Sequence, residues 1–404
     1  MTEGSPASRR GPFGASAHRV PGPLPGVHRV PATVAHTRGA VLTLDADAAA
    51  PRAGLIEHLL ARGALHDPAW ERALARVPRH AFVPEFYQRE GPGKWRTVTR
   101  HSPDYLSGVY ADAPLTTQLT DGTPTSSSSQ PSLMVMMLEA LDLHDGSRVL
   151  EVATGTGYNA ALLCDRLGGD RVTTVEVDPV LAGLARTRLA ALGHAPTVVT
   201  GDGRSGHRPG APYDALIATC GFQRIPADWP EQLRPGGVIV CPVGWGNARL
   251  VVADGGRAEG RFLSSGSYFM SVREAGATGS VPLPEPPESP DRRPAVLGPA
   301  GPFGDDSFDF LLSVAVPGIR FAPEEGPGGS VGVCVAWRAD GSWARVEHGT
   351  VRQAGPVRLW DAVEAAHACY TDHGRPGRQR FGLTVTPDAQ RVWLDTPDGP
   401  SWPL

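Results

Sequence analysis

The chain has 404 residues, which is enough for two or three domains with a substantial hydrophobic core. Its 49 glycines and 40 prolines lie just under the content at which low-complexity disorder becomes the default, so we expect a globular body with disordered parts. With 38 basic and 42 acidic residues, the formal charge of −4 gives no overall field for holding nucleic acid or an anionic membrane.

The N-terminal region divides into two parts. Residues 1–50 are rich in Gly, Pro, Ala, Ser and Arg and have no helical or strand periodicity, so we predict a disordered leader. From Gly54 to Arg76, apolar residues recur at helical spacing, and Asp67-Pro68 is a typical N-cap followed by proline at the first helical position. The sequence therefore predicts two helices separated near residues 63–66.

The middle of the chain alternates between short apolar runs and helical segments. This alternation is typical of a parallel, doubly wound α/β sheet with helices on both faces. We expect helices at 158–167 and 180–192. We expect strands at 149–152, 172–177, 197–200, 215–219 and 238–242.

The C-terminal region begins with a stretch dense in proline, glycine and acidic residues at 278–305, which predicts a linker. We therefore expect a main domain at 51–277 and a small α+β domain at 306–404. In the smaller domain the pattern predicts a helix at 359–373. It predicts strands at 308–316, 331–337, 343–347, 380–386 and 391–394.

The strongest local motif is Glu151-Val-Ala-Thr-Gly155-Thr-Gly157-Tyr158, which stands between an apolar strand and a helix. Glycines at such a turn let the backbone approach a nucleotide-like ligand closely. Glu176 ends the next strand, at the position where a carboxylate can accept hydrogen bonds from two ribose hydroxyls. An ordinary tight turn with a surface glutamate is the simpler alternative.

This motif is not a dinucleotide fingerprint, because Ala153 and Ala160 stand where glycines are required, and no Gly-Lys-Ser/Thr phosphate loop occurs. It resembles the E/D-x-G-x-G-x-G motif of class I S-adenosylmethionine methyltransferases, with alanine replacing the first glycine. In that superfamily, a carboxylate at the position of Asp202 bonds the adenine amino group. The resemblance implies S-adenosylmethionine as cofactor, bound by Glu151, Ala153, Gly155, Gly157, Glu176, Asp202 and Gly203.

Three further segments narrow the resemblance: Val77–Pro84, the serine run leading to Glu139, and Leu233–Gly244. Together with the cofactor motif they are similar to protein L-isoaspartate O-methyltransferases over residues 54–275. Family members methylate a β-linked aspartyl carboxylate, and the ester then closes to a succinimide. The family's Gln-Thr-Ile is missing before the helix at 131, but Ser129 occupies the position of the serine that holds the substrate carboxylate. The resemblance thus implies a catalytic role for Ser129.

The C-terminal extension, including residues 379–385 and 391–395, is similar to that of actinobacterial homologues, some of which tailor ribosomally made peptides. That resemblance implies methylation of an aspartyl side chain in a peptide and closure to aspartimide. General repair of isoaspartyl damage is one alternative. A non-catalytic peptide-binding module on the same fold is another, suggested by Ala153 and the altered serine run.

Compartment and cofactor chemistry complete the expectations. The five cysteines form no C-x-x-C pair, and no apolar run reaches the length of a membrane span. We expect a soluble cytoplasmic enzyme with no metal, whose partner is a peptide or protein carrying Asp or isoAsp. An aspartyl carboxylate is already ionised at neutral pH, so it needs no general base to attack a methyl group.

Overall fold

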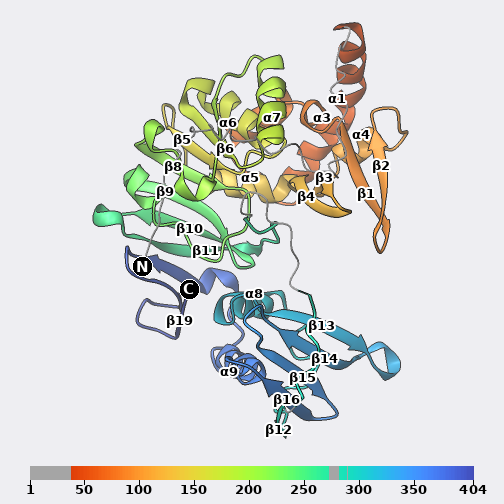
Figure 1. Cartoon of the computed structure of the whole chain (residues 1–404). Helices are drawn as coiled ribbons and strands as arrows, with labels where there is room; N and C mark the ends of the chain where they lie inside the picture. The colour runs from red at the N-terminus through yellow and green to blue at the C-terminus, as the bar shows by residue number, and fades with distance from the viewer. Residues whose placement is uncertain (1–37, 273–281, 289) are drawn as a thin grey trace, which may run out of the picture.

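The computed structural model describes residues 38–272, 282–288 and 290–404, and its largest element is a ten-stranded sheet (Figure 1). Its strands are β5 (Val149–Val152), β6 (Val172–Glu176), β7 (Thr197–Thr200), β8 (Tyr213–Ala218), β9 (Leu233–Val243), β10 (Gly246–Val252), β11 (Ala258–Gly266), β17 (Phe381–Val385), β18 (Gln390–Leu394) and β19 (Ser401–Pro403). Their order across the sheet is β19-β18-β17-β11-β10-β9-β8-β5-β6-β7.

The half of this sheet from β7 to β9 is parallel, and the remaining strands pair antiparallel. Every residue of β5 and β6 is buried, as expected for strands that are covered on both faces. The helices α6 (Tyr158–Leu167) and α7 (Pro179–Ala191) cross between parallel strands, and Asp178 caps α7 by accepting from the amides of Val180 and Leu181. The predicted fold class is confirmed.

The N-terminal part is a layer of helices with a small sheet of order β2-β1-β3-β4, beside the main sheet in Figure 1. Its elements are α1 (Arg38–Ala61), α2 (Pro68–Arg76), α3 (Arg79–Phe82), β1 (Glu85–Gly91), β2 (Lys94–Thr99), α4 (Tyr105–Val109), β3 (Leu115–Thr120), β4 (Thr123–Ser128) and α5 (Pro131–Glu139). The predicted helices on either side of residues 63–66 are confirmed by α1 and α2.

The predicted leader extends too far, because α1 already begins at Arg38. Packing against the body compensates for the weak helical pattern of this segment: Ala48, Leu55 and Leu59 are buried in the same apolar core as α2 and α6. Residues 1–37 lie outside the described part of the chain.

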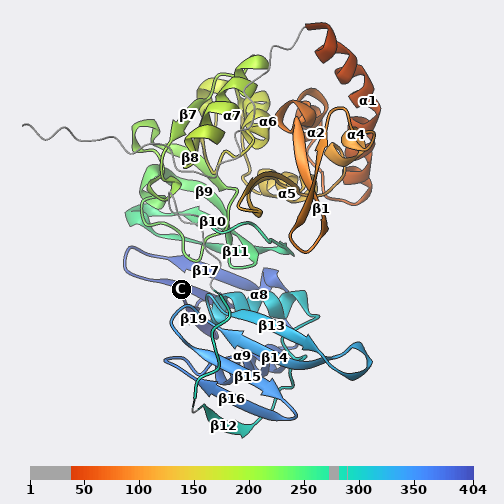
Figure 2. The same ribbon diagram turned by 45° about the vertical axis from the view of Figure 1, so that its right-hand side comes forward.

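The C-terminal part contains a second, five-stranded antiparallel sheet of order β12-β16-β15-β14-β13, which Figure 2 shows below the main sheet. Its elements are β12 (Asp291–Pro294), α8 (Asp306–Ala315), β13 (Arg320–Glu325), β14 (Val331–Trp337), β15 (Trp343–Glu347), β16 (Thr350–Ala354) and α9 (Leu359–Asp372). The strand predicted at 308–316 is wrong, because this segment is helix α8. Asp305 caps the helix through the amides of Ser307 and Phe308, and the continuous apolar run did not distinguish a buried helix from a strand.

The predicted domain borders also need correction. The segment 306–404 is not separate, because β17, β18 and β19 continue the main sheet beyond β11, through the pairing of β11 with β17 (Figures 1 and 2). Phe310 of α8 packs on Phe262 of β11 and Phe381 of β17, with ring centroids 4.7 and 5.3 Å apart. A truncation before residue 306 would therefore strip three strands from the main sheet and expose the edge of β11.

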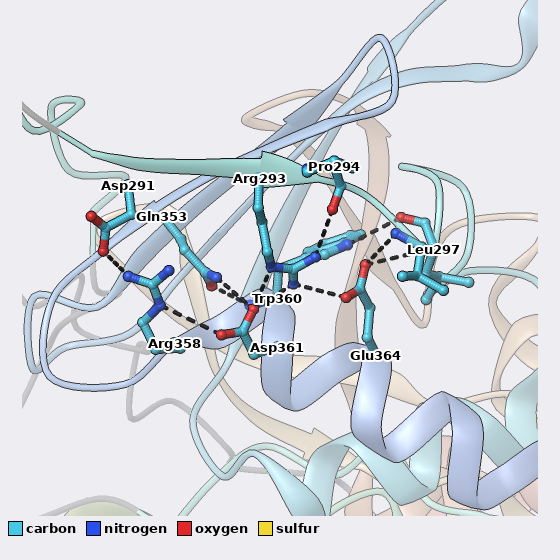
Figure 3. A network of polar contacts seen from close by, with 10 residues as sticks. Asp291, Arg293, Pro294, Leu297, Gln353, Arg358, Trp360, Asp361 and Glu364 are labelled. Carbon is cyan, nitrogen blue, oxygen red and sulfur yellow. Dashed lines mark hydrogen bonds and ion pairs between the residues drawn. The ribbon is translucent and has the colours of Figure 1, made fainter.

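The predicted linker at 278–305 contributes strand β12 to the second sheet, where β12 pairs with β16. Figure 3 shows the polar contacts that hold β12 against α9. Arg293 binds the carboxylates of Asp361 and Glu364, and Glu364 also accepts from the amide of Leu297 at 3.0 Å. Arg358 forms an ion pair with Asp291. These contacts hold residues 291–297 against α9, while residues 278–281 and 289 of the predicted linker lie outside the described part of the chain.

Candidate functional site

A cavity of about 880 Å³ opens at the edge of the main sheet where β5, β6 and β8 end. The carboxyl ends of the strands are where doubly wound sheets bind their ligands. Most of its wall comes from three parts of the chain: the turns after these strands and β7, the serine-rich end of β4 with α5, and residues 264–272. Residues 62–66, between α1 and α2, and residues 114–116 complete it. Six of the predicted site residues line it: Ser129, Ala153, Gly155, Glu176, Asp202 and Gly203.

Glu176, at the end of β6, forms part of this wall although its side chain is nearly buried. Its Oε2 accepts from the amide of Gly155 at 2.8 Å, and its Oε1 accepts from the amide of Asp178 at 3.0 Å. These bonds fix the carboxylate and the glycine turn relative to one another. The sequence motif assigned both residues to one cofactor site, and the structure brings the two together.

Three positions of the predicted motif have left-handed backbone: Ala153 and Gly155 (φ +54°) line the cavity, and Gly157 does not. Ala153 has a φ of +72°, a conformation that costs an L-residue about 1–2 kcal/mol and that glycine adopts freely. Gly157, with a φ of +90°, precedes α6 and lies outside the wall. A Cβ at Gly157 would be 3.2 Å from the Cβ of Ala185, so this glycine permits close packing of α6 on α7. Its predicted contact with the cofactor stays a prediction, while its packing role is clear from the structure.

Glu151 is also absent from the cavity wall, which corrects its predicted contact with the cofactor. Its side chain is fully buried beneath the turn, where Oε1 accepts from Asn159 Nδ2 at 2.7 Å and Oε2 from Thr174 Oγ1 at 2.5 Å. Burial raises the pKa of Glu151 to about 7, and the two hydrogen bonds oppose part of that rise. Glu151 supports the turn from below.

Asp202 and Gly203 form the wall beyond β7. The carboxylate of Asp202 accepts from Arg204 Nε at 2.9 Å and Nη2 at 2.7 Å, and this pairing lowers the pKa of Asp202. A Cβ at Gly203 would come within 2.4 Å of Val152 Cγ1, so the chain can pass the end of β5 only with glycine at this position. Asp202 thus offers a charged oxygen acceptor at one end of the cavity.

The serine run lies at the opposite side of the glycine turn. It forms strand β4, in which Ser126 and Ser128 are buried, and Ser129 follows directly in the cavity wall. A Cβ at Gly155 would be 3.6 Å from the carbonyl oxygen of Ser127, so the serine strand and the cofactor turn approach each other closely. The cavity therefore combines a nucleotide-type half with a half that carries hydroxyl groups.

Comparison with known proteins matches the part of the chain that forms most of this cavity. The family model of protein-L-isoaspartate(D-aspartate) O-methyltransferase matches residues 96–265. A protein-L-isoaspartate O-methyltransferase of Ignicoccus hospitalis is 38% identical over 194 residues, covering 47% of this chain and 80% of the relative. One of Methylorubrum populi is 36% identical over 238 residues, covering 58% and 95%. The chain belongs to the protein-L-isoaspartate O-methyltransferase family.

A solved structure named protein-L-isoaspartate O-methyltransferase has a TM-score of 0.50 and 23% identity, and the likeness covers 85% of this chain and all of that one. At this identity it confirms the fold alone. The family's cofactor is S-adenosylmethionine, which the cavity fits in size and through the carboxylates of Glu176 and Asp202 in its wall. The family match ends at residue 265, so the second sheet and β17–β19 lie beyond it.

Sequence reasoning missed Arg79, which lies behind the serine strand of this family member and is fully buried. Its guanidinium donates to the carbonyl oxygens of Val109 (2.8 Å) and Ser129 (2.9 Å). The other acceptors are the carbonyls of Ala111, Ala113 and Ser128 and the hydroxyl of Ser128. Burial lowers the pKa of Arg79 to about 10, so it remains charged. The signal was an arginine within the apolar segment 77–84.

The third part of the wall, residues 264–272, was also not foreseen. It comprises the end of β11 and the residues after it, and it is held to the turn after β8. The amide of Gly221 donates to the carbonyl of Met270 at 2.8 Å, and that of Val272 donates to the carbonyl of Gly221 at 2.7 Å. Tyr268 and Met270 line the cavity while exposing 62% and 36% of their surface. No sequence motif marks this segment, because it lies far from the cofactor turn in the sequence and reaches the cavity only in the folded chain.

Among the described residues, no helix is both long and apolar enough to cross a bilayer. The same part of the chain contains no cluster of three or more His, Cys, Asp or Glu side chains suited to hold a metal ion.

Proposed function

We propose that this protein is an S-adenosylmethionine-dependent carboxyl O-methyltransferase that acts on an aspartyl or isoaspartyl side chain of a peptide. One observation carries the proposal: the glycine turn with Glu176 and the serine strand with Ser129 line the same cavity. In that arrangement a nucleoside end would bind Glu176 and Asp202, and an acceptor carboxylate would bind at Ser129. Family membership supports the same reaction class.

In this reaction the protein mainly aligns the acceptor carboxylate with the methyl group of the cofactor, and it does not need to transfer a proton. When bound, S-adenosylmethionine supplies an electrophilic methyl group. The acceptor carboxylate is ionised at neutral pH, so the hydroxyl of Ser129 would orient it by donating a hydrogen bond. Arg79 holds the Ser129 carbonyl at 2.9 Å and thereby fixes the backbone of the acceptor side. Such positioning in a partly closed cavity can lower a barrier by several kcal/mol.

Within this activity we propose peptide tailoring, in which an aspartyl ester closes to aspartimide. Two departures from the minimal family support it: the serine run replaces the usual residues before α5, and a C-terminal part beyond the family match is joined to the catalytic sheet. General isoaspartyl repair is the second candidate, favoured by the names of the relatives. Ala153 would suit a non-catalytic binding module, because its methyl group narrows the cavity near the cofactor turn.

Mass spectrometry of peptide pairs tests this proposal. Purified full-length protein, incubated with S-adenosylmethionine, should add one methyl group to an aspartyl peptide from a constrained precursor and then give the product of methanol loss. Efficient methylation of unrelated isoaspartyl peptides, with aspartyl peptides ignored, would establish repair instead. Cofactor binding without any transfer would favour the binding module.

In the same assay, Ser129→Ala should lower kcat/KM about 10- to 100-fold, because one hydrogen bond to a charged carboxylate is lost. Affinity for the cofactor should stay nearly unchanged, since Ser129 faces the acceptor half. Thr123→Ala, at the exposed start of the same strand, is the matched control and should keep full activity. Equal loss of transfer and of cofactor affinity would show that Ser129 is structural.

Glu176→Ala should weaken cofactor binding by about 1–3 kcal/mol, measured by calorimetry, through lost charge-assisted bonds to the ribose. The alanine also removes the acceptor for the Gly155 amide, so Glu176→Gln is needed beside it. Glutamine keeps an oxygen for that amide and removes only the charge. An affinity for the cofactor that both variants retain in full would exclude Glu176 as the ribose ligand.

A further inference from the structure

The mouth of the cavity carries an aromatic side chain that is unusually exposed. Tyr268 exposes 62% of its surface, and Met270, two residues later, exposes 36%. Both line the cavity, together with the half-buried Leu133 and Met136 of α5 on the acceptor side. Exposed apolar side chains gathered at a binding cavity are typical of surfaces that bind a partner's apolar group.

Tyr268 is held at its outer end by the C-terminal part of the chain. Its hydroxyl donates to Asp306 Oδ1, in the first turn of α8. The buried Arg378 fixes Asp306 in turn, with Nη1 2.5 Å from Asp306 Oδ2 and Nη2 2.6 Å from its carbonyl oxygen. Partial desolvation of the hydroxyl end and its hydrogen bond to Asp306 raise the pKa of Tyr268 to about 12, so the hydroxyl remains a donor at neutral pH.

A second contact fixes the ring itself. The ring of Trp245, in the turn between β9 and β10, lies 5.9 Å from that of Tyr268, centroid to centroid. Trp245 is tied to the same C-terminal elements, because its amide lies 3.0 Å from the Ser313 hydroxyl of α8 and its carbonyl accepts from Arg378 Nε at 3.3 Å. Tyr268 is therefore rigid although exposed, which lowers the entropic cost of binding on its ring.

We propose that Tyr268 is a specificity-determining residue of the proposed methyltransferase: its ring, with Met270, receives an apolar side chain next to the acceptor aspartyl residue. Asp306 is a positioning residue that holds Tyr268 in place. The inference rests on the proposed function and names its substrate class, a peptide in which the acceptor has an apolar neighbour. It also gives the C-terminal part a defined role. Helix α8 and Arg378 lie beyond the family match, and their contacts hold Tyr268 in the cavity wall.

The test uses full-length protein and peptide sets that differ only in the residue on either side of the acceptor, leucine or serine. The wild type should prefer leucine on one side by about tenfold in kcat/KM. Tyr268→Ala should remove that preference and leave cofactor affinity unchanged. Tyr268→Phe, which leaves the Asp306–Arg378 pair in place, and Asp306→Ala should each reduce the preference in part. Val251→Ala, at an exposed apolar residue of β10, is the matched control and should keep it.

Calorimetric titration of the same peptides into protein loaded with S-adenosylhomocysteine gives a reading that does not need turnover. A leucine preference that persists in Tyr268→Ala, in rate or in binding, would overturn the inference while leaving the methyltransferase proposal intact. If the wild type transfers no methyl group, the proposed function fails, and the binding preference still decides whether Tyr268 selects the neighbouring residue. Equal binding of both peptides by the wild type also overturns it.

Discussion

Replacing Arg79 by alanine is expected to lower the free energy of unfolding by about 3–5 kcal/mol, the range seen when a buried charged network loses its donor. Five carbonyl oxygens and the Ser128 hydroxyl would lose the donor that the fully buried Arg79 provides. Urea unfolding measures this loss. Methyl transfer, assayed where the variant is still folded, should fall because Ser129 is no longer held.

Two variants control this experiment. Arg76→Ala, three residues earlier, removes an arginine with an exposed side chain and a single ion pair, at 3.4 Å, to the largely buried Asp165, so it should cost clearly less than Arg79→Ala. Arg79→Lys keeps the charge but cannot reach both groups of carbonyls at once, so it should keep only part of the stability. Equal effects of Arg79→Ala and Arg76→Ala would contradict the supporting role of Arg79.

The buried carboxyl of Glu151 is expected to make stability depend on pH. Its pKa of about 7 in the folded protein lies above the value of 4.5 for an unperturbed glutamate. The folded state therefore binds the proton more tightly than the unfolded state. This stabilisation is complete below about pH 4.5 and is lost as the pH rises through 7, a change of up to about 3 kcal/mol.

Unfolding measured between pH 4.5 and 8 for wild type and Glu151→Gln isolates this contribution. Glutamine does not titrate, so the free energy of unfolding of the wild type should fall relative to that of the variant as the pH rises through this window. Glu57→Gln, at an exposed glutamate of α1, is the matched control and should follow the wild type. Parallel curves for wild type and Glu151→Gln would show that Glu151 is ionised throughout.

Local sequence predicted the parallel half of the main sheet well. Strand β5 and helix α6 begin and end where the apolar run and the helical spacing place them, because all of their local signals favour one structure. The segment 308–316 failed for the opposite reason, since an unbroken apolar run fits a buried helix and a buried strand equally. Strands β17 and β18 were predicted as strands, but their pairing with β11 depends on contacts distant in sequence.

The sequence by itself determined the fold class, the family and the residues on both halves of the cavity, because a turn between a strand and a helix has a fixed local geometry. Tertiary structure decided which motif residues line the cavity: Glu151 supports the turn from below and Gly157 packs against α7, both outside the cavity wall. It also decided the roles of Arg79 and Tyr268. The hydrogen-bond acceptors of Arg79 lie 30 to 50 residues further along the chain, and Asp306, the acceptor of Tyr268, lies 38 residues further. Only folding brings such groups within hydrogen-bond distance.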